Sequence, residues 1–269
     1  MKLIVETGAT KSEWCLLTPD GDQKRIRTGG INFSSMSRQT IEQAISESFA
    51  RLDVRPSNIK EVHIYAAGML GGEMAEYFPY SYVECASDLL GAARALFGHR
   101  QGVAAILGTG SNSCLYDGDA IVSCFRSGGY IIGDEGGSTA IGRDFLADFI
   151  KGLVPKTLSE EFADEFKADY NSIVAGVYKS ERPAAYIGSF TPWICRRYAS
   201  EEYITELIDN QIRLFFKRAL SRYGVRDAGI VGGFAQAMQQ AIHKVAAEFG
   251  MQICQILDSP MDKLIQFHL

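Results

Sequence analysis

The sequence lacks any long hydrophobic run, and this absence excludes a membrane-spanning helix. Its 269 residues are 46% apolar and 22% charged, which is the ordinary composition of a soluble globular protein. The first residues form a predicted strand and do not carry the pattern of a secretory signal. We therefore expect a cytoplasmic protein with one large or two medium domains.

The chain also lacks an excess of positive charge. The formal net charge is -5, whereas a nucleic-acid-binding protein presents a basic face. We therefore expect no nucleic-acid partner. An anionic ligand is still compatible with this charge, because backbone N–H groups in a glycine-rich turn bind phosphate without a large basic patch.

The usual patterns of metal and nucleotide sites are missing as well. The six cysteines include no C-x-x-C pair and the four histidines form no H-E-x-x-H motif, so we expect reduced cysteines and no zinc or iron–sulfur site. No G-x-x-x-x-G-K-[ST] motif is present, which excludes a P-loop. The stretch from Gly108 to Ser113 begins like a dinucleotide fingerprint but lacks its third glycine and continues into an apolar run.

What the sequence does contain is one pattern that occurs twice, about a hundred residues apart. Each copy has an apolar run, a Thr-Gly turn, a second run with Cys-Leu, a DGD hairpin signal, a third run and a double glycine. The copies extend over residues 7–30 and 109–129. Either two ordinary meanders are similar by chance, or two related hairpins place glycine-rich turns on opposite sides of one cleft.

Hydrophobic periodicity predicts an α/β protein with mixed sheets and covering helices. Apolar residues at helical spacing predict a helix over 38–52, and helical stretches are also expected over 88–97, 139–180, 201–223 and 259–269. Strands are predicted at 2–7, 12–18, 23–28, 62–68, 81–85, 103–108, 112–116, 120–126, 228–233 and 251–256. Segment 181–200 contains two prolines, Pro183 and Pro192, and receives no assignment.

Two groups of acidic residues follow predicted strands. Asp88 stands where the strand ending near residue 86 gives way to a helix, so it is either a helix N-cap or a general base for a substrate hydroxyl. Asp134 and Glu135 lie in a glycine-flanked loop just before another helix. They either cap that helix or accept hydrogen bonds from a polyol.

Four motifs, taken in order, are similar to those of the BadF-type ATPases of the actin-like superfamily. Within that family the chain most resembles the N-acetylglucosamine kinase branch, and the resemblance covers nearly the whole chain. The motifs are Thr7-Gly8-Ala9-Thr10-Lys11-Ser12, Gly108-Thr109-Gly110-Ser111-Asn112, Gly133-Asp134-Glu135-Gly136 and Val231-Gly232-Gly233.

The resemblance implies two ribonuclease-H-like domains that close over ATP and a sugar. The first domain would comprise residues 1–104, completed by a helix at 259–269, and the second residues 105–258. Hinges are expected near 103–108 and 255–260. The family also suggests a homodimer.

The resemblance further implies an ATP-dependent sugar kinase, with the 6-hydroxyl of N-acetylglucosamine as the expected acceptor. Asp88 would take the proton from the attacking hydroxyl, Glu6 would help to hold hydrated Mg²⁺, and both phosphate turns would contact ATP. The nucleotide-binding residues would be Gly8, Thr10, Lys11, Thr109, Gly110, Ser111, Gly232 and Gly233. The sugar-binding residues would be Asn32, Gly68, Asp134 and Glu135.

The chain departs from the family pattern at the end of its first strand, where Glu6 replaces the usual Asp. Octahedral Mg²⁺ tolerates little change in ligand geometry. This departure leaves open a weakly active or non-catalytic sensor that binds ATP and sugar. A BadF-like activator ATPase is a second alternative, but it would need cysteines to hold an iron–sulfur cluster, and the cysteines here are scattered.

Overall fold

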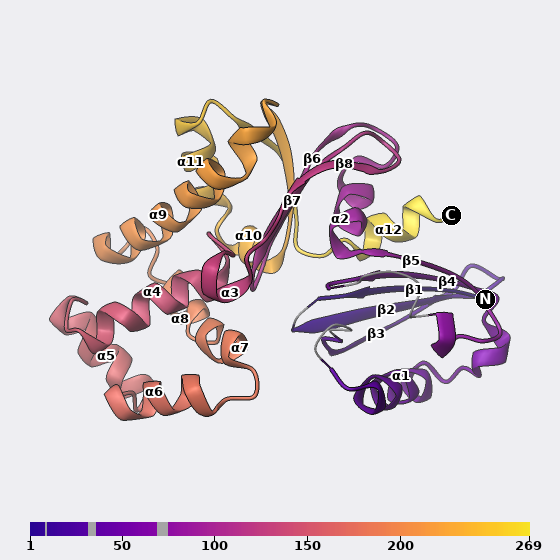
Figure 1. The fold of residues 1–269 in the computed structure, drawn as a ribbon, viewed down its shortest axis with the longest axis horizontal. Coiled ribbons are helices and arrows are strands. Elements are labelled where there is room, and N and C mark those ends of the chain that lie inside the picture. The colour runs from indigo at the N-terminus through magenta and orange to yellow at the C-terminus, as the bar shows by residue number, and fades with distance from the viewer. Residues whose placement is uncertain (9, 32–35, 69–74) are drawn as a thin grey trace. The chain divides into compact units, whose positions relative to one another are not determined.

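A computed structural model describes residues 1–8, 10–31, 36–68 and 75–269. The chain divides into two compact units and contains two five-stranded sheets (Figure 1). The first unit comprises residues 1–104, 114–123 and 259–269, and the second comprises 105–113 and 124–258. Residues 114–123, which the sequence analysis placed in the second domain, group with the first unit. Within this segment Tyr116 donates a hydrogen bond to the carbonyl of Gly98, also in the first unit, at 2.9 Å.

The sheet of the first unit has the strand order β3-β2-β1-β4-β5. Its first three strands form an antiparallel meander, and β4 and β5 continue the sheet parallel to β1. The strands are β1 (Lys2–Thr7), β2 (Lys11–Leu17), β3 (Gln23–Gly29), β4 (Glu61–Ala66) and β5 (Tyr82–Ser87). The helices are α1 (Arg38–Leu52), α2 (Asp88–Phe97) and α12 (Met261–Phe267).

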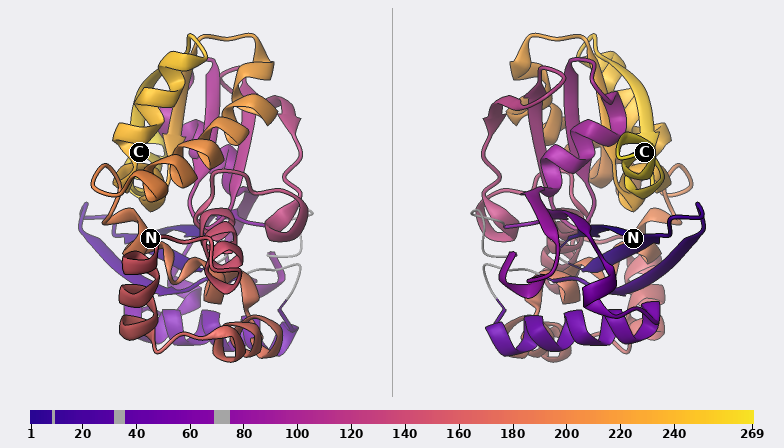
Figure 2. Two further views of the ribbon diagram at one scale, coloured as in Figure 1. Left: turned by 90° about the vertical axis from the view of Figure 1, so that its left-hand side faces the viewer. Right: turned by 90° about the vertical axis from the view of Figure 1, so that its right-hand side faces the viewer.

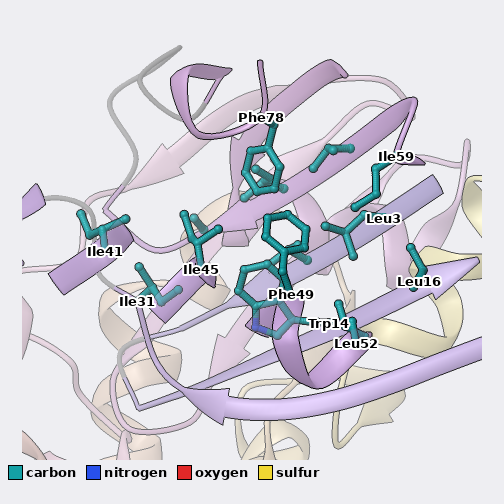
Figure 3. Close-up of a cluster of buried hydrophobic side chains, with 14 residues drawn as sticks. Leu3, Trp14, Leu16, Ile31, Ile41, Ile45, Phe49, Leu52, Ile59 and Phe78 are labelled. Carbon is teal, nitrogen blue, oxygen red and sulfur yellow. The ribbon is translucent and has the colours of Figure 1, made fainter. Parts of the chain in front are cut away.

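Alternation along β1 gives the first sheet two different faces. Leu3 and Val5 join the apolar core under α1, where Phe49 and Phe78 pack edge to face with their ring centroids 5.7 Å apart (Figure 3). The alternate residue Glu6 points to the opposite face, which α2 and α12 cover (Figures 1 and 2). That face carries most of the polar side chains of this sheet.

The second sheet, most of whose residues belong to the second unit, has the order β10-β9-β6-β7-β8. Its strands are β6 (Gly102–Leu107), β7 (Ser111–Tyr116), β8 (Ile121–Phe125), β9 (Asp227–Val231) and β10 (Gln252–Leu257). Read from the third strand, the order β8-β7-β6-β9-β10 repeats the order β3-β2-β1-β4-β5 of the first unit. The last two strands are parallel in both sheets. The repeated strand order favours duplication over chance similarity.

Helices fill the rest of the second unit, and none among the described residues is long and apolar enough to span a membrane. Segment 181–200, unassigned from the sequence, contains two short helices, α7 and α8. Both pack against α4, and aromatic rings join α8 to α5; Phe162 and Trp193, for example, pack edge to face with centroids 5.2 Å apart. The helices are α3 (Gly129–Ile132), α4 (Ser138–Ile150), α5 (Lys156–Phe166), α6 (Tyr170–Lys179), α7 (Pro183–Gly188), α8 (Thr191–Cys195), α9 (Glu202–Arg218), α10 (Gly233–Ala237) and α11 (Gln239–Glu248).

We predict that Phe49→Ala lowers the free energy of unfolding by about 3–5 kcal/mol, because it leaves a cavity between α1 and the sheet. Urea denaturation followed by circular dichroism measures this change. Ser46→Ala on the exposed face of the same helix is the control and should shift stability by less than about 0.5 kcal/mol. Equal effects of the two variants would contradict the role of Phe49 in the core.

Candidate functional site

The turn between β1 and β2 contains the first predicted group of phosphate-binding residues. The N–H of Gly8 donates to the carbonyl of Lys11 at 2.9 Å, which closes the turn. The carbonyl of Thr10 accepts from the N–H of Gly30 at 3.1 Å, so the double-glycine loop after β3 is tied to the same turn. The two glycine-rich segments of the first copy are therefore neighbours in the structure.

Glu6 lies on β1 just before this turn, on the face covered by α2 and α12. Its partners in the strand register are Glu13 on β2 and Tyr65 on β4. Burial, together with the negative charge of Asp88, raises the pKa of Glu6 to about 7, against the opposing charge of Lys11. The carboxyl group thus lies within electrostatic reach of both the candidate base and the turn.

Asp88 is the first residue of α2, and the structure separates its two possible roles. Ser87 is the N-cap, since its hydroxyl accepts from the N–H of Leu90 at 3.1 Å. Asp88 Oδ1 accepts from the N–H of the next residue, Leu89, at 2.9 Å. Burial raises the pKa of Asp88 to about 6, although this hydrogen bond acts in the opposite direction. The helix is capped without Asp88.

Raised pKa values of two neighbouring carboxyl groups are typical of a functional site. Ionised Glu6 and Asp88 repel each other in a half-buried environment, which costs folding free energy. A bound cation, or a proton that one of the two carboxylates accepts from a substrate, reduces this cost. The oxygen donors of this pair are of the kind that Mg²⁺ prefers, so the residues fit such an ion chemically.

The turn between β6 and β7 contains the second predicted group of phosphate-binding residues. It consists of the three residues Gly108, Thr109 and Gly110, and the N–H of Gly108 donates to the carbonyl of Gly110 at 3.0 Å. By position in the hairpin, Gly108 is equivalent to Gly8, whereas the sequence comparison had paired Gly8 with Gly110. Gly8 and Gly108 each follow the last residue of the first strand of their hairpin, so the structure aligns these two glycines. The repeated Thr-Gly pair instead aligns Gly8 with Gly110, two residues further along the chain.

Asp134 supports this second turn. Its Oδ1 atom accepts from the Ser127 hydroxyl at 2.6 Å and from the N–H of Ser111 at 3.3 Å. The carboxyl group also lies against Gly110, where an added Cβ would come within 2.6 Å of Oδ2. Asp134 has a φ of 56°, in the left-handed region that Asp tolerates better than most residues. The carboxylate therefore joins the turn to the loop that follows β8.

Neither acid of the Gly133–Gly137 loop caps α4. The N-cap is Gly137, which makes no side-chain capping bond. The first two N–H groups of α4, on Ser138 and Thr139, donate instead to the carbonyls of Gly108 and Thr109, at 2.8 and 3.1 Å. The helix N-terminus is thereby fixed to the second turn.

The neighbouring residues of this loop are held by α9. Glu135 forms an ion pair with Arg218, and the N–H of Gly136 donates to Gln211 Oε1 at 3.2 Å. The amide group of buried Gln211 also donates to Asp144 on α4. A single glutamine side chain thus connects the loop, α9 and α4.

Gly232 and Gly233 lie between β9 and α10. Gly232 has a φ of 147°, and a Cβ there would collide with the carbonyl of Leu107, at the end of β6. A Cβ on Gly233 would approach Asp258 Oδ1 to 3.0 Å. The close approach of the backbone beside the second turn therefore requires a glycine at position 232. The contact of Gly232 and Gly233 with adenosine stays a prediction.

The predicted residues therefore gather in two groups, one in each unit. In the first unit Glu6, Lys11 and Asp88 interact electrostatically. Gly68, with a φ of 70°, follows Ala67, whose N–H donates to the carbonyl of Thr7 at 2.9 Å, beside the first turn. The predicted sugar ligand Asn32 lies outside the described residues. In the second unit, the group is Thr109, Gly110, Ser111, Asp134 and Gly232.

Sequence reasoning missed three supporting residues of the second group. For Ser127 the one available sequence signal is its position just before the double glycine. No local sequence pattern indicates a role for Arg218 or Gln211. The last two lie on α9, more than seventy residues after the loop that they hold. Only the packing of α9 brings them there.

Comparison with known proteins gave one family match over almost the whole chain. The model of the BadF/BadG/BcrA/BcrD ATPase family matches residues 5–262. A search of curated protein sequences gave no match.

Solved structures include a provisionally named N-acetylglucosamine kinase from Porphyromonas gingivalis, with 34% identity and a TM-score of 0.93 over 100% of this chain and 98% of that one. A second protein with the same provisional name, from Chromobacterium violaceum, has 18% identity and a TM-score of 0.74 over 99% of this chain and 98% of that one. A ROK family glucokinase from Streptomyces griseus, solved with glucose and AMPPNP, has 13% identity and a TM-score of 0.57 over 99% of this chain and 97% of that one. The last two show a shared fold.

We predict that Asp88→Asn stabilises the folded protein at neutral pH. The folded-state pKa of Asp88 rises from 3.8 to about 6, so wild-type stability falls as the pH rises through this interval. The variant, which cannot ionise there, should gain on the order of 1–3 kcal/mol above pH about 6 and little below pH about 4. Urea denaturation across this pH range measures the difference. Asp20→Asn, in an exposed turn, is the control, and a less stable Asp88→Asn at pH 7 would contradict the prediction.

We also predict different effects for two substitutions of Asp134. Asp134→Ala removes the acceptor of the Ser127 and Ser111 bonds and should cost about 1–3 kcal/mol of stability. Asp134→Asn keeps a side-chain oxygen and tolerates positive φ, so it should lose less than half as much. Thermal unfolding of both variants tests this order, and equal losses would show that the bonds through Oδ1 do not stabilise the turn.

Proposed function

Because the chain belongs to the BadF/BadG/BcrA/BcrD ATPase family, we propose that it is an ATP-dependent sugar kinase that phosphorylates a hydroxyl of an N-acetylated amino sugar. The 6-hydroxyl of N-acetylglucosamine is the acceptor we favour. The similarity to the Porphyromonas gingivalis protein over the full length of the chain supports this choice.

The observation that carries the proposal is the environment of Asp88. A helix-capping role is already filled by Ser87, and burial holds the pKa of Asp88 near 6. A carboxylate with this pKa is unprotonated at pH 7 yet basic enough to accept a proton from a sugar hydroxyl during transfer. The hydrogen bond from the N–H of Leu89 holds Oδ1 of this carboxylate in place.

In this proposal the phosphates of ATP are bound mainly by backbone groups. The turns at Gly8–Lys11 and at Gly108–Ser111 present amides and hydroxyls, and Lys11 adds one positive charge. Glu6 would hold the hydrated Mg²⁺ that accompanies ATP, and that ion neutralises charge on the phosphates. Gly232 and Gly233 would lie against the adenosine.

The sugar-binding assignment rests on the first double-glycine loop and on the Gly133–Gly137 loop. Asn32, Gly68, Asp134 and Glu135 are the proposed ligands. The Oδ1 atom of Asp134 already serves Ser127 and Ser111, so we assign the sugar hydroxyl to Oδ2. Glu135, which is paired with Arg218, would act from the edge of the site.

A sensor that binds ATP and sugar without turnover is the second candidate. Its basis is Glu6, whose pKa of about 7 leaves it partly protonated at neutral pH and a weaker ligand for a cation than a fully ionised carboxylate. In this case both substrates bind, and phosphate transfer is absent or slow.

We predict sugar-dependent ADP release from MgATP, measured in a coupled assay with N-acetylglucosamine, N-acetylmannosamine, glucosamine and glucose. Asp88→Asn should lower kcat by about 10²–10⁴-fold, because it removes the proton acceptor. The control Asp20→Asn removes the same charge from an exposed turn and should retain the parent rate.

Two other results would change the function that we propose. Activity that appears only in Glu6→Asp would show that the cation site of this chain is displaced. Binding of ATP and sugar by calorimetry, with no ADP release from the wild type or from Glu6→Asp, would favour the sensor.

A further inference from the structure

A polar network in the first unit joins the C-terminal residues to the helix that carries Asp88. It lies on the face of the sheet covered by α2 and α12, two helices that pack against each other (Figure 1). The residues that we assign to it lie outside the glycine-rich motifs. Its members are Lys2, Glu61, His63, Tyr65, Glu84, Arg94, Phe267 and His268.

The centre of the network is a hydrogen-bonded chain with one direction. Arg94 Nη1 donates to Tyr65 Oη at 2.8 Å, and a guanidinium group has no acceptor. The hydroxyl of Tyr65 is therefore left to donate to His268 Nε2, 2.7 Å away. His268 accepts this bond as a neutral imidazole, and burial, together with the charge of His63, lowers its pKa to about 4.

Three further contacts fix the C-terminal residues. The imidazole of His268 stacks on that of His63 with centroids 3.7 Å apart, and Lys2 Nζ donates to the carbonyl of His268 at 2.5 Å. The guanidinium of Arg94 lies 5.0 Å from the centre of the Phe267 ring. The segment after α12 is thus held by β1, β4 and α2.

The same cluster does not suit a metal ion, although His63, Glu84 and His268 have ligand atoms within 4.8 Å of one another. Both nitrogens of His63 already bond to carboxylates, of Glu84 at 2.8 Å and of Glu61 at 2.7 Å. Glu84 is also paired with Arg94 at 2.7 Å. A dication would have to displace these bonds beside a fixed guanidinium, so the cluster is a hydrogen-bonded network.

The network bears directly on α2, a helix of ten residues that starts at Asp88. Arg94 lies in its second half, and Gly91 packs so closely on Tyr65 that an added Cβ would come within 2.8 Å of the ring. Tyr65 is in turn the register partner of Glu6 on β1. The position of α2 over the sheet therefore depends on Tyr65 and Arg94 together.

We propose that His268 is a positioning residue: by accepting the Tyr65 hydroxyl it holds Tyr65 and Arg94, and through them keeps Asp88 at its working position on α2. The catalytic part of this proposal rests on the proposed kinase function. Arg94 Nε is buried and has no hydrogen-bond partner among the described residues, whereas Nη1 bonds to both Tyr65 and Glu84. Tyr116 also interacts with this guanidinium. Loss of the acceptor at His268 frees the Tyr65 hydroxyl to turn, and the restraint on Arg94 weakens with it.

The test compares three variants of the full chain. His268→Ala removes the acceptor, and His268→Gln offers a side-chain oxygen in its place. Leu269→Ala changes the neighbouring residue, whose side chain is 87% exposed, and is the matched control. Backbone hydrogen exchange is measured in α2 and, for reference, in α1 on the other face of the sheet.

We expect exchange in α2 of His268→Ala to be about tenfold faster than in the parent, while exchange in α1 is unchanged. In the kinase assay the same variant should lose about tenfold in kcat, with KM for ATP and sugar within twofold of the parent. His268→Gln should recover most of both effects, and Leu269→Ala should show neither.

Unchanged exchange in α2 of His268→Ala would overturn the proposal, as would equal acceleration in α1 and α2, which indicates a general loss of stability. Accelerated exchange in α2 with the kcat of the parent would also overturn it, because Asp88 would then not depend on the network. A parent protein that phosphorylates no sugar contradicts the kinase function, whereas the exchange measurement still decides whether His268 positions α2.

Discussion

Two carboxyl groups of the first unit interact in a half-buried environment, and the elements that carry them fix this unfavourable arrangement. Glu6 is fixed by the register of β1 between β2 and β4, and Asp88 by the first turn of α2. Burial raises the pKa of both, and the charge of Asp88 raises that of Glu6 further. Such a pair destabilises the fold at neutral pH, so its presence favours a function for both groups.

In the second unit, hydrogen bonds hold the short glycine turn between β6 and β7 in one conformation. The carbonyls of Gly108 and Thr109 accept from the first two amides of α4, and the carboxylate of Asp134 accepts from Ser111. We assign the phosphates of ATP to the amides and hydroxyls of this turn. Since the turn is restrained from two sides, phosphate binding would cost little conformational entropy.

The duplication could be recognised in the sequence, but its alignment could not be. The strand order of both sheets shows that Gly8 and Gly108 occupy equivalent positions. The sequence comparison paired Gly8 with Gly110, because the same Thr-Gly pair occurs in both copies. Hydrogen bonding between strands sets the register of a hairpin, and a dipeptide repeat does not report it.

Patterns in the sequence predicted the order and type of most elements, including the helix at 38–52 and the start of α2 after Ser87. These features depend on apolar periodicity and on hydrogen bonds within a few residues. Tertiary structure alone decided that Gln211 holds the Gly136 loop, that His268 lies on His63 and that Glu6 and Asp88 share one environment. Burial and charge coupling arise between residues distant in the chain, so no local pattern encodes them.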